Sequence, residues 1–480
     1  MLGTARALGP LVMRNGLAGV AVAAAMALLV GAIAMRSPQA ATTLTLLLLL
    51  PAVRAQSRSA GLMTLWAYWL LVPMVRRILD LSAETPGADP LSLLPFLGTA
   101  LLAVMELREN QLDRRARRIL TAASAGFLLG VPTGLLADPA AVSFATLAYL
   151  AAVSAFVLGW GDAMRPEAGS TLYRALAVTL IPLSLYAILQ YFFPLTSWDA
   201  HWVEAGELGS IGAPQEDHIR VFSTLNSPFT FAIALSTGIV LGLGIARRLG
   251  ASLLLTLPLV LALALTYVRS AWLALVVGVL VFAFAARSRA AGRIVAAIAI
   301  ALVGLVAVGG SNPTTQAFTQ RVTSLGSPEE DVSARERLEI TQRLVPASVR
   351  QPLGEGLGQA GLAVRLEDSN ETERLVDVDD GYLSLLYQSG PFGLLLVLAA
   401  IVSSVRAAIR VLGHADPESR LAPAALLAAL TMLLVALASA DVFFGLPGAI
   451  FWYLCGLAVA YASVPATAET LPVRFMPREE

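Results

Sequence analysis

Long apolar runs recur along nearly the whole sequence and constrain the fold more than any other feature. A helix needs roughly 20 mostly apolar residues to cross about 30 Å of hydrocarbon, and runs of this kind cover most of the chain. The 480 residues are 57% hydrophobic and only 14% charged, whereas soluble domains carry roughly 25% charged residues. Because backbone polar groups in lipid must be satisfied within the protein, we expect the runs to be helices.

The runs predict an all-α polytopic membrane protein with about 12–14 transmembrane helices. The predicted spans are mostly apolar and cover residues 17–35, 38–53, 60–78, 91–107, 119–136, 139–159, 171–194, 221–246, 249–267, 270–286, 294–309, 381–404, 421–440 and 443–463. The first run is longer than the apolar region of a secretory signal peptide, so we predict an uncleaved span. The predicted parts are an N-terminal bundle (1–219), a second transmembrane region (220–465) and a tail (466–480).

Arginine-rich loops set the predicted orientation, because cytoplasmic loops carry an excess of positive charge. Four such loops fall on one side, at Arg114–Arg118, Arg247–Arg248, Arg287–Arg293 and Arg406–Arg410. We predict that this side is cytoplasmic, with both termini on it, in the cytoplasmic membrane of a bacterium. Arg36, Arg76 and Arg77 fall on the other side and oppose this orientation for the first spans.

Two long loops are predicted on the outer side. The first, Leu195–Arg220, is acidic and contains two tryptophans; the second, Gly310–Asp380, is rich in Asp, Glu and Arg and contains no His. Long irregular loops are uncommon unless they are functional or disordered. We therefore expect function at the outer face, with the second loop folded over the membrane.

Composition argues against several classes of function. Formal net charge is zero, so no overall basic field favours nucleic acid. A single cysteine, Cys455, excludes an internal disulfide and a cysteine-based metal cluster. The three histidines, His201, His218 and His414, are scattered. We expect neither a metal nor a cofactor.

Glycines at Gly356, Gly358 and Gly361 have the spacing of a dinucleotide-binding fingerprint. That fingerprint needs a strand before it and a helix after it, and here it lies in a predicted outer loop. We expect the glycines to allow a tight turn or a close backbone approach instead.

Arg269 lies with Ser270 between two spans at the outer face. A planar guanidinium suits phosphate oxygens, so Arg269 is a candidate anion ligand. The alternative is an arginine that extends to lipid headgroups.

Arg220 precedes a predicted span with Asn226 and Pro228 in its first turns. Proline there breaks or kinks a helix and frees backbone groups to face a cavity. The alternative is a helix that simply begins late.

Arg335 and Arg337 stand at the head of a helical stretch with Glu336 and Glu339. Mixed charges at this spacing are typical of a solvated helix face, and anion binding by the two arginines is the other possibility.

Three acids, Asp377, Asp379 and Asp380, precede a long apolar run. An aspartate at a helix start caps the helix and complements its dipole by roughly 0.3–1 kcal/mol. Asp380 is placed for that role, and capping does not require the other two. An acid near a low-dielectric surface can have a raised pKa and accept a proton. We predict Asp379 and Asp380 as catalytic candidates, with Asp379 first.

Taken in order, four segments resemble the O-antigen ligase and O-antigen polymerase family of bacterial membrane glycosyltransferases. The segments are RVFSTLNSPFTFA, TYVRSAWLAL, RERLEITQRLVPASVRQPLGEGLG and DDGYLSLLYQSGPFGLLLVL, and the resemblance covers roughly residues 220–465. It implies a type C glycosyltransferase-like architecture, transfer on the outer side without a metal, and an undecaprenyl-diphosphate-linked oligosaccharide as donor. A glycan acceptor, the lipid bilayer and a chain-length regulator are the other partners that we consider.

The resemblance also implies roles for single residues. Arg220 and Arg269 become diphosphate ligands, with Arg335 or Arg337 as further candidates. Asp379 falls where the family often has His or Asp, and Asp380 where Asn is usual.

Three functions are compatible with the sequence. Because the large loop lacks His, the chain is less similar to ligases that transfer finished glycan to lipid A core, and we favour a polymerase of repeat units for O-antigen, capsule or exopolysaccharide. Ligation to lipid A core or another acceptor is the first alternative. A polysaccharide or lipid transporter is the second; it is disfavoured because we find no strong internal repeat and most ionisable residues lie in outer loops.

Overall fold

Helices form every regular element in the part of the chain that the structure describes. The structure is a computed structural model and describes residues 38–81, 90–165, 171–205, 211, 219–244, 249–287, 332–360, 378, 380–415 and 419–463. The predicted all-α polytopic membrane fold is confirmed. The predicted spans 17–35 and 294–309, the tail 466–480 and much of the loop 310–380 lie outside the described residues.

The helices follow the predicted spans closely. Their bounds are α2 Pro38–Gln56, α3 Arg58–Asp80, η1 Pro90–Leu93, α4 Leu94–Glu109, α5 Arg114–Leu128, α6 Val131–Ala137, α7 Pro139–Ala163, α8 Thr171–Phe192, α9 Ser197–Ala205, α10 Pro228–Leu243, α11 Leu249–Leu265, α12 Arg269–Ala286, α15 Val332–Val349, α16 Gly381–His414, α17 Leu421–Leu437 and α18 Gly445–Ser463. Within the described residues, eight helical segments are long and apolar enough to cross a membrane, and shorter apolar helices accompany them.

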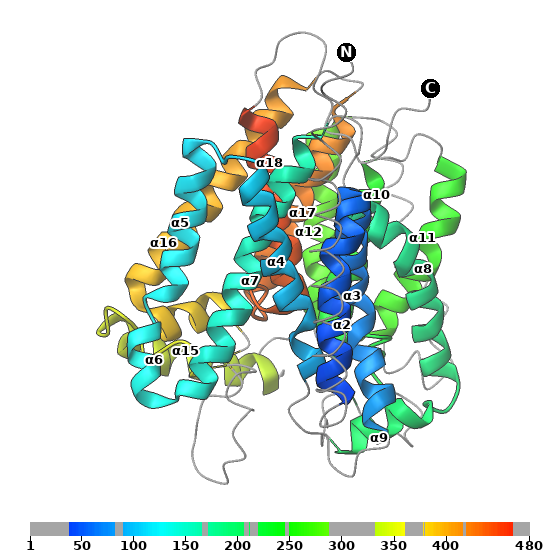
Figure 1. Ribbon diagram of the computed structural model, residues 1–480, viewed down its shortest axis with the longest axis horizontal. Helices are drawn as coiled ribbons and strands as arrows, with labels where there is room; N and C mark the ends of the chain where they lie inside the picture. The colour runs from blue at the N-terminus through cyan, green and yellow to red at the C-terminus, as the bar shows by residue number, and fades with distance from the viewer. Residues whose placement is uncertain are drawn as a thin grey trace, which may run out of the picture.

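The apolar helices stand side by side, and three further helices lie at one end of the bundle (Figure 1). We name this the α9 end; it carries α6, α9 and α15. The opposite end, where α5 begins, is named the α5 end. Successive spans alternate in direction, so α10, α12, α16 and α18 all begin at the α9 end.

The centre of the bundle consists of α7, α10, α17 and α18, whose side chains are largely buried. A helix that is apolar on all sides fits burial by other helices. A Cβ atom added to Gly159 would lie 2.0 Å from the Tyr453 carbonyl oxygen, and one added to Gly456 would lie 2.0 Å from that of Phe156. The two glycines thus let the backbones of α7 and α18 touch, as small residues do in membrane helix pairs.

Among the helices that differ from the predicted bounds are α10 and α16. The span expected from residue 221 begins at Pro228, where Ser227 caps the helix and proline occupies its first turn, because a proline is tolerated there and not further inside. The alternative of a late helix start is therefore the observed one. The helix expected over 381–404 continues to His414 and bends at Gly390, which has a φ of 69° and precedes Pro391.

Candidate functional site

A buried, non-helical segment leads into α10 at the α9 end. Residues 219–227 contain no helix, and Ser223 has a φ of 55°, a left-handed conformation that is uncommon for residues other than glycine. The backbone is anchored on both sides, because the Arg220 N–H donates to the Ile211 carbonyl at 2.9 Å and the Val221 N–H to the Leu265 carbonyl at 3.2 Å. Non-helical backbone at this depth is tolerated where it is buried in protein or lines a cavity.

Arg77, at the end of α3, holds this segment in place. Its Nη1 donates to the Leu225 carbonyl at 2.7 Å and its Nη2 to the Ser223 carbonyl at 2.7 Å. Its Nε lies 2.9 Å from Asp199 Oδ1, and both side chains are fully buried. One of the three charges that oppose the predicted orientation is thus neutralised inside the protein, so Arg77 does not act as a free interfacial cation.

Asp199 on α9 joins a second set of contacts to the same segment. It accepts hydrogen bonds from the Tyr186 hydroxyl at 2.6 Å and from Gln190 Nε2 at 2.7 Å. Gln190 Oε1 in turn accepts from the Ser223 N–H at 2.7 Å. The segment is therefore fixed by α3, α8 and α9 together.

The two arginines predicted to bind diphosphate lie close together in this region. Arg220 Nε donates to the Thr266 carbonyl at 3.2 Å, and α12 begins at Arg269, directly after the turn that contains Thr266. Both side chains are partly exposed. The structure thus brings Arg220 and Arg269 to one turn, although the sequence places them in different loops.

The other two predicted arginines belong to α15. Arg335 and Arg337 lie in the first turns of this helix, and their side chains lie outside the described residues. A small apolar cluster with Leu344 and Leu383 joins α15 to the beginning of α16 at the α9 end. The helix that carries both arginines therefore packs beside the start of α16.

Of the predicted acids, the structure describes Asp380. Its side chain caps α16 by accepting from the Tyr382 N–H at 2.8 Å and the Leu383 N–H at 3.1 Å, which confirms the predicted capping role. Asp377 and Asp379 lie outside the described residues. A catalytic role for either Asp379 or Asp380 stays a prediction.

An acid that the sequence did not single out lies next to this helix start. Asp441 is partly buried in the turn between α17 and α18, and a Cβ atom added to Gly381 would lie 3.1 Å from its Cα. Asp441 accepts a hydrogen bond from the Tyr149 hydroxyl and, at 2.9 Å, from the Phe443 N–H. Burial raises the pKa of Asp441 to about 6, which suits proton transfer near neutral pH.

The glycine-rich loop after α15 connects to this acid. Gly356 and Gly358 have φ values of 129° and 83°, and a Cβ atom on Gly356 would lie 2.5 Å from the Gly134 Cα, so the predicted close backbone approach is confirmed. The Gly358 N–H donates to Gln388 Oε1 at 2.8 Å, and Gln388 Nε2 donates to the Tyr149 hydroxyl at 3.2 Å. The loop and Asp441 are therefore linked through two side chains.

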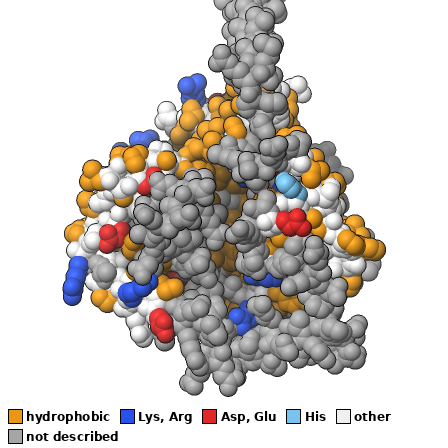
Figure 2. Space-filling view, turned by 90° about the horizontal axis from the view of Figure 1, so that it is seen from below, with side chains coloured by type: hydrophobic (Ala, Val, Ile, Leu, Met, Phe, Trp, Pro, Cys, Tyr) orange, Lys and Arg blue, Asp and Glu red, His pale blue; other side chains and the backbone are white. Residues whose placement is uncertain are grey.

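Seen from below, the α9 end shows basic and acidic side chains beside hydrophobic surface (Figure 2). Across the described ranges, no group of three or more His, Cys, Asp or Glu side chains is placed to hold a metal ion. The α9 end thus contains two neighbouring arginines, Arg220 and Arg269, and, near the start of α16, a carboxylate with a raised pKa.

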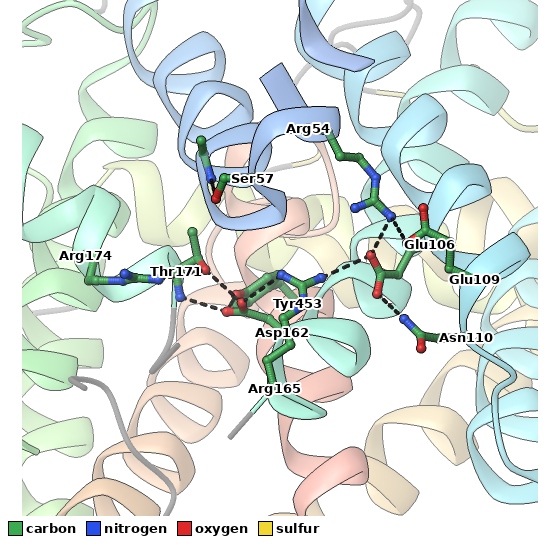
Figure 3. A network of polar contacts seen from close by, with 11 residues as sticks. Arg54, Ser57, Glu106, Glu109, Asn110, Asp162, Arg165, Thr171, Arg174 and Tyr453 are labelled. Atoms are coloured by element: carbon green, nitrogen blue, oxygen red, sulfur yellow. Dashed lines mark hydrogen bonds and ion pairs between the residues drawn. The ribbon is translucent and has the colours of Figure 1, made fainter. Parts of the chain in front are cut away.

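A second polar network lies at the α5 end (Figure 3). Glu106 Oε2 accepts from Arg54 at 3.0 Å and from Arg165 at 3.1 Å. Asp162 accepts from the Thr171 N–H at 2.7 Å and from the Tyr453 hydroxyl. The acids in this network are paired with cations and hydroxyls from neighbouring helices, which is the pattern of a structural network.

Comparison with known protein families supports the sequence resemblance. Residues 252–398 match the sequence profile of the O-antigen ligase family, so the predicted family is confirmed over this segment. The segment contains Arg269, α15, the glycine-rich loop and the first part of α16. No curated protein matches the chain. The chain is thus a multi-pass membrane protein with a domain of a family associated with glycan transfer.

Proposed function

We propose that this chain, whose residues 252–398 form an O-antigen ligase domain, is a glycosyltransferase that polymerises lipid-diphosphate-linked oligosaccharide repeat units. The product is O-antigen, capsule or exopolysaccharide. The family match is the observation that carries the proposal, because it includes Arg269 and the beginning of α16. The neighbouring positions of Arg220 and Arg269 at the α9 end add support. Arg269 lies inside the matched segment and Arg220 lies outside it.

The proposed chemistry is a displacement at the anomeric carbon of the donor sugar. An acceptor hydroxyl oxygen forms the new glycosidic bond, the bond from the anomeric carbon to phosphate oxygen breaks, and the lipid diphosphate leaves with the electron pair. Arg220 and Arg269 stabilise the charge that develops on the leaving diphosphate, and prearranged cations in a partly dry site do this strongly. Arg335 or Arg337 on α15 provides a further contact to it.

The proton of the acceptor hydroxyl passes to a carboxylate. Asp379 is the proposed acceptor of this proton, since it directly precedes the cap of α16. Asp380 orients the helix start through its two backbone contacts and stays a second catalytic candidate. Asp441 is the neighbouring acid whose raised pKa fits a share in the proton transfer.

The α9 end faces the outer side of the bacterial cytoplasmic membrane in this proposal, and both termini lie in the cytoplasm. The donor is an undecaprenyl-diphosphate-linked oligosaccharide, and the reaction needs no metal. Support for the orientation comes from Arg114–Arg118 and Arg406–Arg410, which lie toward the α5 end, together with the positive-inside rule.

Ligation of finished glycan to lipid A core or another acceptor is the second candidate. The match to the O-antigen ligase family favours ligation as much as it favours polymerisation. We place polymerisation first because the loop from Gly310 to Asp380 contains no histidine. The two reactions share the donor and differ in the acceptor, so their products distinguish them.

The test uses purified protein in nanodiscs with a lipid-diphosphate-linked oligosaccharide from its own host, and resolves the products by size. A ladder of chain lengths supports the polymerase. A single transferred glycan, formed only when an acceptor such as lipid A core is added, contradicts polymerisation and supports ligation. Donor translocation without any bond formation contradicts both and supports a transporter.

A further inference from the structure

Asn226 occupies an unusual position in the segment that leads into α10. Its side chain is exposed, whereas residues 221–225 before it are buried. Its Oδ1 lies 3.0 Å from Nη1 of the buried Arg77. The adjacent Ser227 already caps α10, since its hydroxyl oxygen accepts from the Phe229 N–H at 3.2 Å. Asn226 is therefore not needed as a helix cap.

The contact with Arg77 fixes which way the amide of Asn226 points. A guanidinium has only donors, so the atom of Asn226 that faces it must be the carbonyl oxygen. The two ends of an amide side chain are otherwise assigned from the hydrogen-bond network, and here the network allows one assignment. The NH2 group of Asn226 consequently points away from Arg77, toward the exposed side, and it donates to no residue in the described part of the chain.

Arg77 has the contacts to hold this orientation. Its guanidinium is fully buried, is paired with Asp199 and also binds the carbonyls of Ser223 and Leu225. The guanidinium lies 5.2 Å from the ring centre of Trp202 and 5.0 Å from that of Phe222. With contacts on every side, Arg77 has little freedom to move, and the amide that it binds is held with it.

We infer that Asn226 donates a hydrogen bond from its Nδ2 to an oxygen of the substrate diphosphate, and that Arg77 is the positioning residue that aims it. The inference rests on the proposed function and adds a neutral donor to the cations Arg220 and Arg269. Arg220 lies on the same segment and binds the turn before α12, so the donor and both arginines belong to one connected part of the α9 end. A preorganised donor of this kind costs no reorganisation when charge develops.

The substitution Asn226→Asp separates this role from a structural one. Aspartate has the same shape, and its carboxylate still accepts from Arg77, with a charge-assisted hydrogen bond. Its second oxygen replaces the outward NH2 group, which removes the donor and repels the diphosphate. We expect the midpoint of thermal unfolding to stay the same or rise, while the Kd for undecaprenyl diphosphate increases about 10-fold or more. Gln111→Glu, an exposed amide near the α5 end, is the matched control and should leave the Kd unchanged.

Arg77→Lys tests the positioning role. Lysine keeps a positive charge beside Asp199 but cannot reach the two carbonyls and the amide with one ammonium group. We expect a lower unfolding midpoint and a Kd increase similar to that of Asn226→Asp. Adding the neutral substitution Asn226→Ala to Arg77→Lys should not weaken binding further, because the aimed donor is already lost.

Each outcome decides the inference. A Kd for Asn226→Asp within about twofold of the wild type, or a marked loss of thermal stability in this variant, overturns it. The proposed function fails separately if the wild type binds undecaprenyl diphosphate but makes no product from the linked oligosaccharide. In that case the Kd values of the wild type and Asn226→Asp still test the role of Asn226. A wild type that does not bind undecaprenyl diphosphate overturns both.

Discussion

The two ends of the bundle both hold charged side chains, and they use them differently. At the α5 end, Glu106 is almost fully buried and is shared by Arg54 and Arg165, so each charge has a partner from another helix (Figure 3). At the α9 end, Arg220 and Arg269 are partly exposed. Arg220 lies on a non-helical segment that other residues hold, and Arg269 is the first residue of α12.

The difference suggests that the α5 end serves stability and that the α9 end serves the proposed function. A closed, buried network joins helices and is costly to break on one side, but it offers nothing to a ligand. In the proposed function, by contrast, the partly exposed Arg220 and Arg269 bind an anionic substrate. Even the buried pair of Arg77 and Asp199 fits this view, because it stabilises the segment that carries Arg220.

The largest expected effect on stability lies at the α5 end. Glu106→Ala removes the shared partner of two arginines, and we expect the free energy of unfolding to fall by about 3 kcal/mol, with an unchanged Kd for the lipid-diphosphate donor. Glu109→Ala, whose side chain is partly exposed, is the matched control and should cost less than about 1 kcal/mol. Thermal unfolding in nanodiscs and donor titration measure the two quantities. If Glu106→Ala stays folded but loses affinity for the lipid-diphosphate donor, the contrast between a structural α5 end and a functional α9 end is wrong.

At the α9 end, Arg269→Ala should do the reverse. We expect the turnover number to fall by about 10²–10³-fold, the typical cost of losing one stabilising group at a developing charge, while the unfolding midpoint stays close to that of the wild type. Size-resolved products and thermal unfolding check both parts. Full chain growth in this variant would remove Arg269 from the proposed site.

A smaller effect is expected in the pH dependence. Burial raises the pKa of Asp441 to about 6, and only the ionised carboxylate can accept a proton. Activity should therefore fall as the pH drops through about 6 and be retained above it. Asp441→Asn should remove the fall in activity near pH 6 and lower activity at neutral pH by about 10-fold. If Asp441→Asn still loses activity below about pH 6 as the wild type does, another group causes that loss.

The smallest expected effect concerns Asp380. Asp380→Asn keeps a good cap, whereas Asp380→Ala loses about 1 kcal/mol of stability. If capping is the whole role, the asparagine variant keeps its activity and its unfolding midpoint. A large loss of activity in Asp380→Asn, with stability retained, moves the catalytic role from Asp379 toward Asp380.

The sequence predicted the features that depend on neighbours along the chain. Apolar runs located the helices, the acids before Gly381 predicted the cap, and the glycines predicted a close approach at Gly356. The start of α10 could also be predicted from the sequence, because Ser227 followed by Pro228 is a common pattern at the beginning of a helix.

Contacts between distant segments could not be predicted in this way. Arg77 and Asp199 belong to different helices, and nothing local distinguishes Arg77 from the neighbouring Arg76. The pairing of Asp441 with Tyr149 likewise depends on how α7 and α18 pack. Hydropathy reports whether a residue faces an apolar solvent and does not report which side chain lies opposite.

The most direct test of the account locates the donor on the protein. An undecaprenyl-diphosphate oligosaccharide with a photoreactive group near the diphosphate is bound in nanodiscs, irradiated, and the labelled peptides are identified by mass spectrometry. The account predicts labels in residues 219–227 and at the beginning of α12, competed by unlabelled undecaprenyl diphosphate. Competable labels around Arg54, Glu106 and Arg165 instead would contradict it, because they would place the site in the network assigned to stability.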